Sequence, residues 1–130
     1  MKAGDLSITY SQEQFKLEPD SLRLRITDDW SAFARFNDEK TMVEFTLTRG
    51  IPLATILEST SVAGLMKGVH SDWVYSRLEA ANDGIVDIKV EEHEGEVRNL
   101  LRVRTMRNVS FDSRWRPLKI NERFEVTLEK

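Results

Sequence analysis

The 130-residue chain contains no cysteine. This absence excludes a disulfide framework, a thiolate metal site and a cysteine nucleophile, and it is typical of proteins of the cytosol or of particles assembled there. Long apolar runs are also missing, and the first residues lack the basic end and apolar stretch of a signal peptide. The sequence therefore predicts a soluble protein without a membrane partner.

A large excess of one charge is missing too. Charged residues make up 32% of the chain, but the formal net charge is only −3, which indicates a finely mixed surface rather than a nucleic-acid-binding or membrane-binding one. No repeat, low-complexity tract or linker divides the chain, and its length is usual for one domain with its own core. We therefore expect a single domain, residues 1–130.

The stretch 84–106 carries the strongest pattern that is present, because it predicts a β-hairpin with one register. With Glu94 and Gly95 as the central turn residues, the opposed pairs are Val86 and Val103, Asp87 and Arg102, Ile88 and Leu101, Val90 and Asn99, and Glu91 and Arg98. One face is then almost wholly apolar and the other charged, and a slip of one residue would destroy both patterns. We expect the apolar face to lie in the core.

Alternation of apolar and polar residues predicts further strands, at residues 6–10, 21–27, 30–36, 43–48 and 124–128. A short segment around Phe15 and Leu17 stays unassigned, residues 37–40 are expected to form a hairpin loop, and the arginines of 21–27 are expected on an outer face. Three-and-four spacing predicts helix from Leu53 to Gly68, as one helix or two short ones. A second helix is expected from Ser71 to Asn82, with a strand as its alternative.

This order of elements predicts a mainly β fold, a β-rich α+β arrangement. About six to seven strands with one or two helices between them favour an antiparallel β-sandwich or half-open barrel, with the helices packed on an edge. A parallel α/β fold is disfavoured because strands do not alternate regularly with helices.

Candidate catalytic and metal-binding groups are few. His70, Ser71 and Asp72 have the residue types of a catalytic triad, but the side chains of adjacent residues point apart, so helix capping is the better interpretation. The acidic stretch around His93 lacks the spacing of a metal loop, and the isolated glycines form no phosphate loop. The sequence predicts no enzyme, no cofactor and no metal site.

Basic residues gather in the last third of the chain around Trp115. They are Arg98, Arg102, Arg104, Arg107, Arg114, Arg116 and Lys119. Such a set can bind phosphates and stack bases, but Arg98 and Arg102 face acidic residues across the predicted hairpin. A monomeric binding or adaptor module that recognises protein or nucleic acid through this region is therefore kept as the alternative function.

The phrases MVEFTLTRG, DIKVEEHEGEVRNLLRVRTMRNVSFDS and FEVTLE, with a leucine-rich helix after the first, resemble bacteriophage tail-tube proteins and the inner-tube proteins of contractile injection systems over residues 41–128. The resemblance implies a structural virion protein, a self-assembling tube-type subunit or another tail or baseplate component. It implies homo-oligomeric rings, hexameric in that family, with other tail proteins as partners and with nucleic acid passing through without specific binding. The helix at 71–82 and the short last strand depart from the family's pattern.

The charged hairpin face would meet neighbouring subunits in such an assembly, because head-to-tail contacts between identical subunits close into rings. The candidate interface residues are Asp87, Lys89, Glu91, Arg98, Arg102, Arg104 and Trp115. Their alternating charges would fix the register between subunits.

Overall fold

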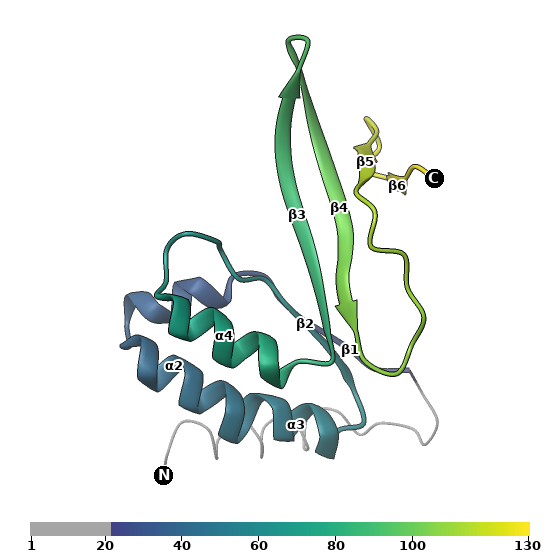
Figure 1. Ribbon diagram of the computed structural model, residues 1–130. Helices are drawn as coiled ribbons and strands as arrows, with labels where there is room; N and C mark the ends of the chain where they lie inside the picture. Colours follow the sequence, from purple (N-terminus) through teal and green to yellow (C-terminus); the bar gives the residue numbers. More distant parts are fainter. Residues whose placement is uncertain (1–21) are drawn as a thin grey trace. The chain divides into compact units, whose positions relative to one another are not determined.

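A computed structural model describes residues 22–130 of the chain (Figure 1). The described residues fall into two compact units, 22–81 and 82–130. The strand expected at 6–10 and the unassigned segment around Phe15 and Leu17 lie outside the described residues. The single domain stays a prediction.

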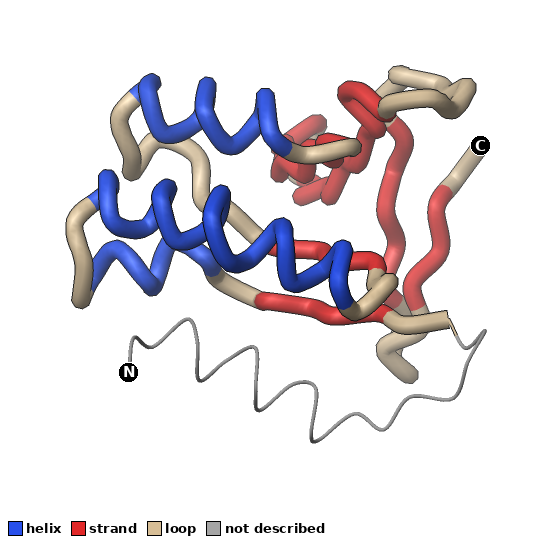
Figure 2. Tube along the Cα trace, turned by 90° about the horizontal axis from the view of Figure 1, so that it is seen from below, coloured by secondary structure: helices blue, strands red, loops and turns tan. Residues whose placement is uncertain are grey.

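The first unit combines helices with a two-stranded parallel sheet. Its elements are β1 (Leu24–Thr27), the 3-10 helix η1 (Trp30–Arg35), α2 (Glu39–Phe45), the π-helical turn η2 (Thr46–Gly50), α3 (Ile51–Ile56), β2 (Thr60–Ala63) and α4 (Asp72–Ala81). In the sheet, Leu24 lies opposite Thr60 and Ile26 opposite Val62. Figures 1 and 2 show α2, η2 and α3 as one continuous helical rod with α4 beside it.

The core of the first unit lies between the two long helical segments. Met42 and Val43 of α2 and Val74 and Leu78 of α4 are buried together. The rings of Trp30, Phe33 and Phe45 stack beside them, with centroids 5.4 to 6.0 Å apart. The helix expected at Ser71–Asn82 is thus confirmed as α4, and its apolar face anchors the unit.

The strand expected at 43–48 is wrong, because this segment belongs to α2 and η2. Val43 and Leu47 are four residues apart, a spacing that fits a helix face as well as alternate positions of a strand. The preceding residues, expected as a hairpin loop, start the helix instead: the Asp38 side chain accepts a 2.7 Å hydrogen bond from the Thr41 backbone N–H. This is the usual N-cap arrangement.

Two neighbouring predictions are also corrected. The strand expected at 30–36 is wrong, because Trp30–Arg35 form η1, and the helix expected from Leu53 to Gly68 ends at Ile56. Glu58 has a positive φ of 48°, which breaks the helical path. The β-branched residues Thr60 and Val62 then form β2, where they pair with β1.

The second unit is a four-stranded antiparallel sheet. Its strands β3 (Gly84–His93), β4 (Glu96–Met106), β5 (Arg116–Ile120) and β6 (Val126–Leu128) lie side by side in that order. The hairpin and every predicted pair in it are confirmed, with a bulge between Ile85 and Val86. Glu94 and Gly95 both have positive φ, as the predicted two-residue turn requires. The last expected strand is confirmed as β6.

The expected antiparallel β-sandwich or half-open barrel is therefore wrong. The described residues form an α+β fold with one parallel and one antiparallel sheet. The physical reason for this error lies in the first unit, where short runs of alternating apolar residues fit the spacing of a helix face as well as that of a strand. Helices took the place of two expected strands, and the parallel strand β2 took the place of part of an expected helix.

Candidate functional site

The charged face of the hairpin is organised around a buried carboxylate. Asp87 is only 3% exposed and accepts hydrogen bonds from Arg102 Nε at 2.9 Å, Arg104 Nε at 3.0 Å and Arg104 Nη2 at 2.8 Å. A buried charge is tolerated when it is paired in this way. The cross-strand pair of Asp87 and Arg102 is thus confirmed, with Arg104 as a second partner.

Trp115 lies on the same cluster. Lys89 Nζ is 4.3 Å and Arg102 Cζ is 4.6 Å from the centroid of its ring, within the range of cation–π attraction. Lys89 also forms an ion pair with Glu91. The cations that would attract a nucleic acid are matched within the unit, so Trp115 is not a free stacking platform.

The structure brings together most of the seven residues expected at an assembly interface. Asp87, Lys89, Arg102, Arg104 and Trp115 form one cluster, and Glu91 joins it through Lys89. Arg98 lies opposite Glu91 in the register, but it forms an ion pair with Glu96, with Nη2 and Oε2 3.8 Å apart. Whether these residues touch another chain stays a prediction.

A second ionic cluster orders the loop before β5. The Asp112 carboxylate accepts hydrogen bonds from the Arg114 side chain and backbone N–H and from the Arg116 guanidinium, at 2.6 to 3.1 Å. These bonds, those from Arg114 first, hold the pKa of Asp112 well below its ordinary value of 3.8. The Asp112 pairs are therefore a source of acid-sensitive stability.

Replacing Asp112 by asparagine should flatten the pH dependence of stability in the acid range. Because the folded-state pKa is depressed, the stabilisation is fully present above the ordinary pKa and is lost as the pH falls through the folded value. Urea unfolding between about pH 5 and about pH 2 measures this slope. Glu92→Gln on β3 is the control and should keep the wild-type slope; an Asp112→Asn slope equal to it would contradict the role of Asp112.

A polar network in the first unit has the residue types of a catalytic triad. His70 Nε2 lies 2.8 Å from Ser31 Oγ, and His70 Nδ1 lies 3.6 Å from Glu39 Oε1. Ser71 donates to Glu39 through both its backbone N–H, at 2.9 Å, and its hydroxyl, at 2.7 Å. These bonds hold the pKa of Glu39 below its ordinary value. The hydroxyl of Ser71 is thus a hydrogen-bond donor to the Glu39 carboxylate.

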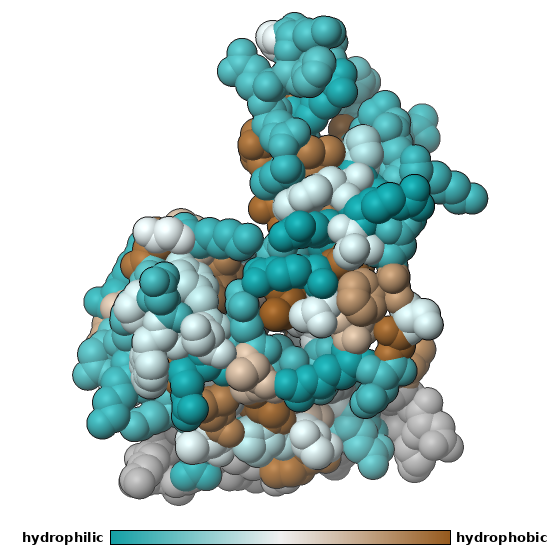
Figure 3. All heavy atoms as spheres, viewed as in Figure 1, coloured by the Kyte–Doolittle hydropathy of each residue, from teal (hydrophilic) through white to brown (hydrophobic). Residues whose placement is uncertain are grey.

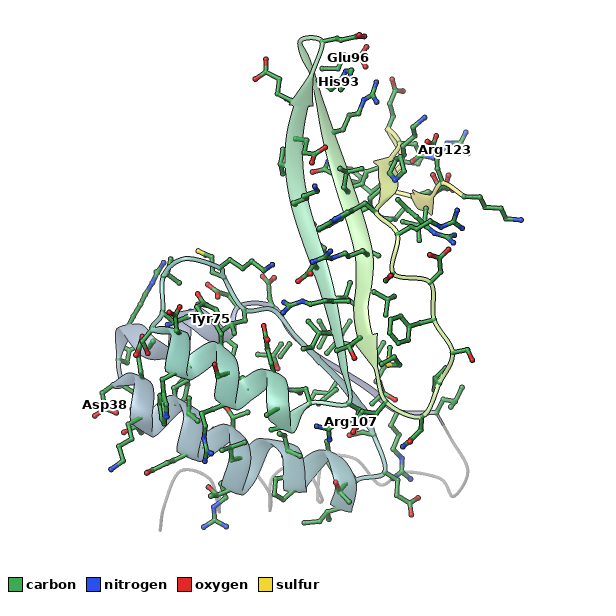
Figure 4. The ribbon with its side chains drawn as sticks, viewed as in Figure 1. Asp38, Tyr75, His93, Glu96, Arg107 and Arg123 are labelled. Carbon is green, nitrogen blue, oxygen red and sulfur yellow. The ribbon has the colours of Figure 1, made fainter. Side chains whose placement is uncertain are left out.

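The same residues hold a loop in place. Ser31 is only 9% exposed, and its Oγ also accepts the Met66 backbone N–H at 2.9 Å. Tyr75 on α4 (Figure 4) fixes the same loop, because its hydroxyl donates to the Met66 carbonyl and accepts from the N–H groups of Val69 and His70. Sequence reasoning missed the network, since its members come from three separate segments.

The apolar face of the second unit is exposed, the reverse of what we expected. Val86, Ile88 and Val90 of β3 are 51%, 61% and 64% exposed, and the register places Leu101 and Val103 beside them. Figure 3 shows apolar side chains at the surface of the hairpin. The face continues across β5 and β6 with Leu118, Ile120, Val126 and Leu128. On the charged face, Asp87 is buried and Lys89, Arg102 and Arg104 are half-buried.

The parallel sheet of the first unit shows the same reversal. Leu24, Ile26 and Val62 are exposed, whereas the arginines expected on an outer face point to the helices. Arg23 Nη1 donates to the Leu57 carbonyl at 2.6 Å, and Arg25 Nη2 donates to the Gly50 carbonyl at 3.3 Å. Parallel strands are usually covered on both faces, whereas in this sheet the apolar side chains stay exposed among residues 22–130.

Other kinds of site find no support among residues 22–130. No group of three acidic or histidine side chains there could hold a metal ion. His93 and Glu96 stand at the tip of the hairpin (Figure 4), where the acidic side chains are exposed. No helix in the same range has both the length and the apolar character to cross a membrane.

Comparison with known proteins identifies the fold. No protein-family model and no curated protein matches the sequence. The structure is similar to that of a KaiC-like protein from the hyperthermophilic archaeon Pyrococcus horikoshii OT3, with 17% identity and a TM-score of 0.74. The match covers 98% of this chain and 55% of the archaeal chain, so this chain spans about half the length of that protein. At this level of identity the similarity concerns the fold alone.

The resemblance to tail-tube proteins is therefore wrong, and the structural virion function is wrong with it. The phrases that carried it describe a hairpin with alternating charged and apolar residues, a pattern that unrelated antiparallel sheets share. The adaptor function through Trp115 and the arginines also has no support. Rings, tail-protein partners and a virion location rested on the same resemblance.

Proposed function

We propose that this chain is a non-enzymatic association module with a KaiC-like fold, and that its apolar sheet faces bind polypeptide. One observation carries this proposal: in both sheets several apolar side chains are exposed, while Asp87 of β3 is buried and Arg25 of β1 donates to a carbonyl of the helical segment. Covering one exposed valine or isoleucine contributes on the order of 1 to 2 kcal/mol. A face with several of them is a strong driving force for association.

Two further observations support a role without catalysis. The 130 residues contain no G-x-x-x-x-G-K-[S/T] phosphate loop, the segment that binds nucleotide in P-loop proteins. The match covers 55% of the KaiC-like neighbour, whose remaining elements have no counterpart in this chain. Exposed sheet faces are the surfaces to which such elements pack.

The proposal is tested by two measurements on the purified chain. Titration with a fluorescent ATP analogue should give no saturable binding, and incubation with ATP should release no phosphate. The apolar dye ANS should bind, and the paired substitutions Ile26→Thr with Val62→Thr, or Ile88→Thr with Val90→Thr, should lower its fluorescence while the circular dichroism spectrum is kept, since threonine favours strands.

The control for the dye is Glu92→Thr, an exposed change on β3 that removes no apolar side chain. It should leave the ANS signal at the wild-type level. Saturable nucleotide binding or ATP turnover would overturn the non-enzymatic role. A dye signal that none of the paired threonine variants changes would overturn the role of the apolar faces.

A further inference from the structure

We infer that β3 pairs antiparallel with β3 of a second copy of this chain, about a twofold axis at Ile88. This inference rests on the proposed association function and names its partner. Among the described strands, β3 is paired on one side only, because the order of its sheet is β3, β4, β5, β6. It is ten residues long, and a long edge strand with exposed apolar residues is a template for a further strand.

The sequence of the edge complements itself. Residues 86–90 read Val, Asp, Ile, Lys, Val. Antiparallel pairing about Ile88 sets Val86 opposite Val90 of the second copy, Ile88 opposite Ile88, and Asp87 opposite Lys89. Apolar residues then meet on one face of the joined sheet and opposite charges meet on the other, the two kinds of cross-strand pair that stabilise a sheet.

Neighbouring registers are poorer matches. An axis at Lys89 would set Lys89 opposite Lys89 and Asp87 opposite Glu91, so like charges would face each other. An axis at Val90 would set Ile88 opposite Glu92. Asp87 already binds Arg102 and Arg104, so its pairing with Lys89 of the second copy adds less than an isolated ion pair would, and its charge disfavours only the axis at Lys89. Like charges directly opposite one another destabilise a sheet, so the axis at Ile88 is selected.

The twofold pairing also provides hydrogen bonds for the backbone of the β3 edge. The outward backbone N–H and C=O groups of β3 gain partners, and a contact between identical strands is closed by its own symmetry. The bulge between Ile85 and Val86 confines the regular edge to the residues after it. Two four-stranded sheets become one continuous sheet, and their exposed apolar faces join into one larger face.

A single introduced cysteine tests the axis, because the natural chain has none. Opposed Cα atoms in an antiparallel pair are about 4.5 to 5.5 Å apart, within the range that a disulfide bridges. Ile88→Cys should therefore oxidise to a covalent dimer, about tenfold faster than the control Val97→Cys. Val97 is 69% exposed on β4, away from the edge. Val90→Cys should be slow, since Val86 lies opposite it.

Sedimentation equilibrium of the cysteine-free protein provides the second readout. The unmodified chain should be a reversible dimer, and Ile88→Lys should weaken it about tenfold or more while Val97→Lys leaves it unchanged. Unchanged circular dichroism shows that each variant is folded. A chain that stays monomeric, or cross-linking of Ile88→Cys no faster than that of Val97→Cys, would overturn the pairing. Faster cross-linking of Val90→Cys would overturn the register.

These failures are distinct from failure of the proposed function. If the dye still reports the apolar faces and no nucleotide binds, a monomeric chain would mean that another polypeptide covers the β3 edge. If nucleotide is turned over, the non-enzymatic role falls whatever the oligomeric state.

Discussion

Replacing Asp87 by alanine should lower the free energy of unfolding of the second unit by about 3 to 5 kcal/mol. The Asp87 side chain is 2% exposed, and it is the acceptor for Arg102 and Arg104. Its removal leaves two part-buried guanidinium groups without that acceptor, and an uncompensated buried charge costs more than an exposed one. Urea unfolding followed by far-UV circular dichroism, with hydrogen exchange of the β3 and β4 amides, measures the loss.

The matched control is Glu92→Ala on the same strand, where an exposed acid is removed. Its effect should stay within about 0.5 kcal/mol. Asp87→Asn should fall between the two, because the amide keeps an acceptor oxygen but loses the charge. An Asp87→Ala protein as stable as Glu92→Ala would contradict the central role of the cluster. It would also mean that Asp87 is not needed to hold Arg102 over the Trp115 ring.

The hairpin shows how much could be predicted from sequence. Its register depends on residues that face each other across one short turn, so local pattern and turn chemistry were enough to pair Asp87 with Arg102. The face that is packed could not be predicted in the same way. Apolar alternation predicted that the face with the valines and isoleucine would be buried. Only the structure shows that Arg104 is a second hydrogen-bond donor to the Asp87 carboxylate. The buried side chain of this hairpin is Asp87, whose charge is paired with two arginines.

The first unit shows why local pattern fails when a partner element decides the structure. Val43 and Leu47 fit a strand and a helix equally well over so short a window. The choice is made by α4, which covers Val43 with Val74 and Leu78 from more than thirty residues away in sequence. That contact has no signature in the segment itself, and the parallel pairing of β1 and β2 was missed for the same reason.

The candidate sites also differ in whether their residues are close in sequence. The charged cluster near Trp115 was expected because its members lie on one hairpin, although its use in assembly remains a prediction. The network of Ser31, Glu39 and His70 was not expected, because it joins η1, α2 and a loop. The fold type itself came from structural similarity, since the sequence has neither a family match nor a phosphate loop.

Replacing Gly64 by alanine should destabilise the first unit by about 3 kcal/mol. An added Cβ would lie 2.1 Å from the carbonyl oxygen of Asp28, a backbone atom that cannot swing away. Gly64 donates to the Thr27 carbonyl at 3.0 Å and accepts from the Trp30 N–H at 2.8 Å, so its backbone continues the pairing of β1 and β2. Relief of the clash would break these bonds, and thermal unfolding measures the loss.

Gly50→Ala is the same chemical change with the opposite expected sign. Gly50 has a helical φ of −62°, and the nearest atom to its added Cβ, the Phe45 carbonyl oxygen, is 4.0 Å away. Alanine should therefore stabilise the helical rod by about 0.5 to 1 kcal/mol. If Gly64→Ala raised the melting temperature as Gly50→Ala does, β1 and β2 could not be paired as described. If both lowered it equally, loss of glycine rather than the clash with Asp28 would be the cause.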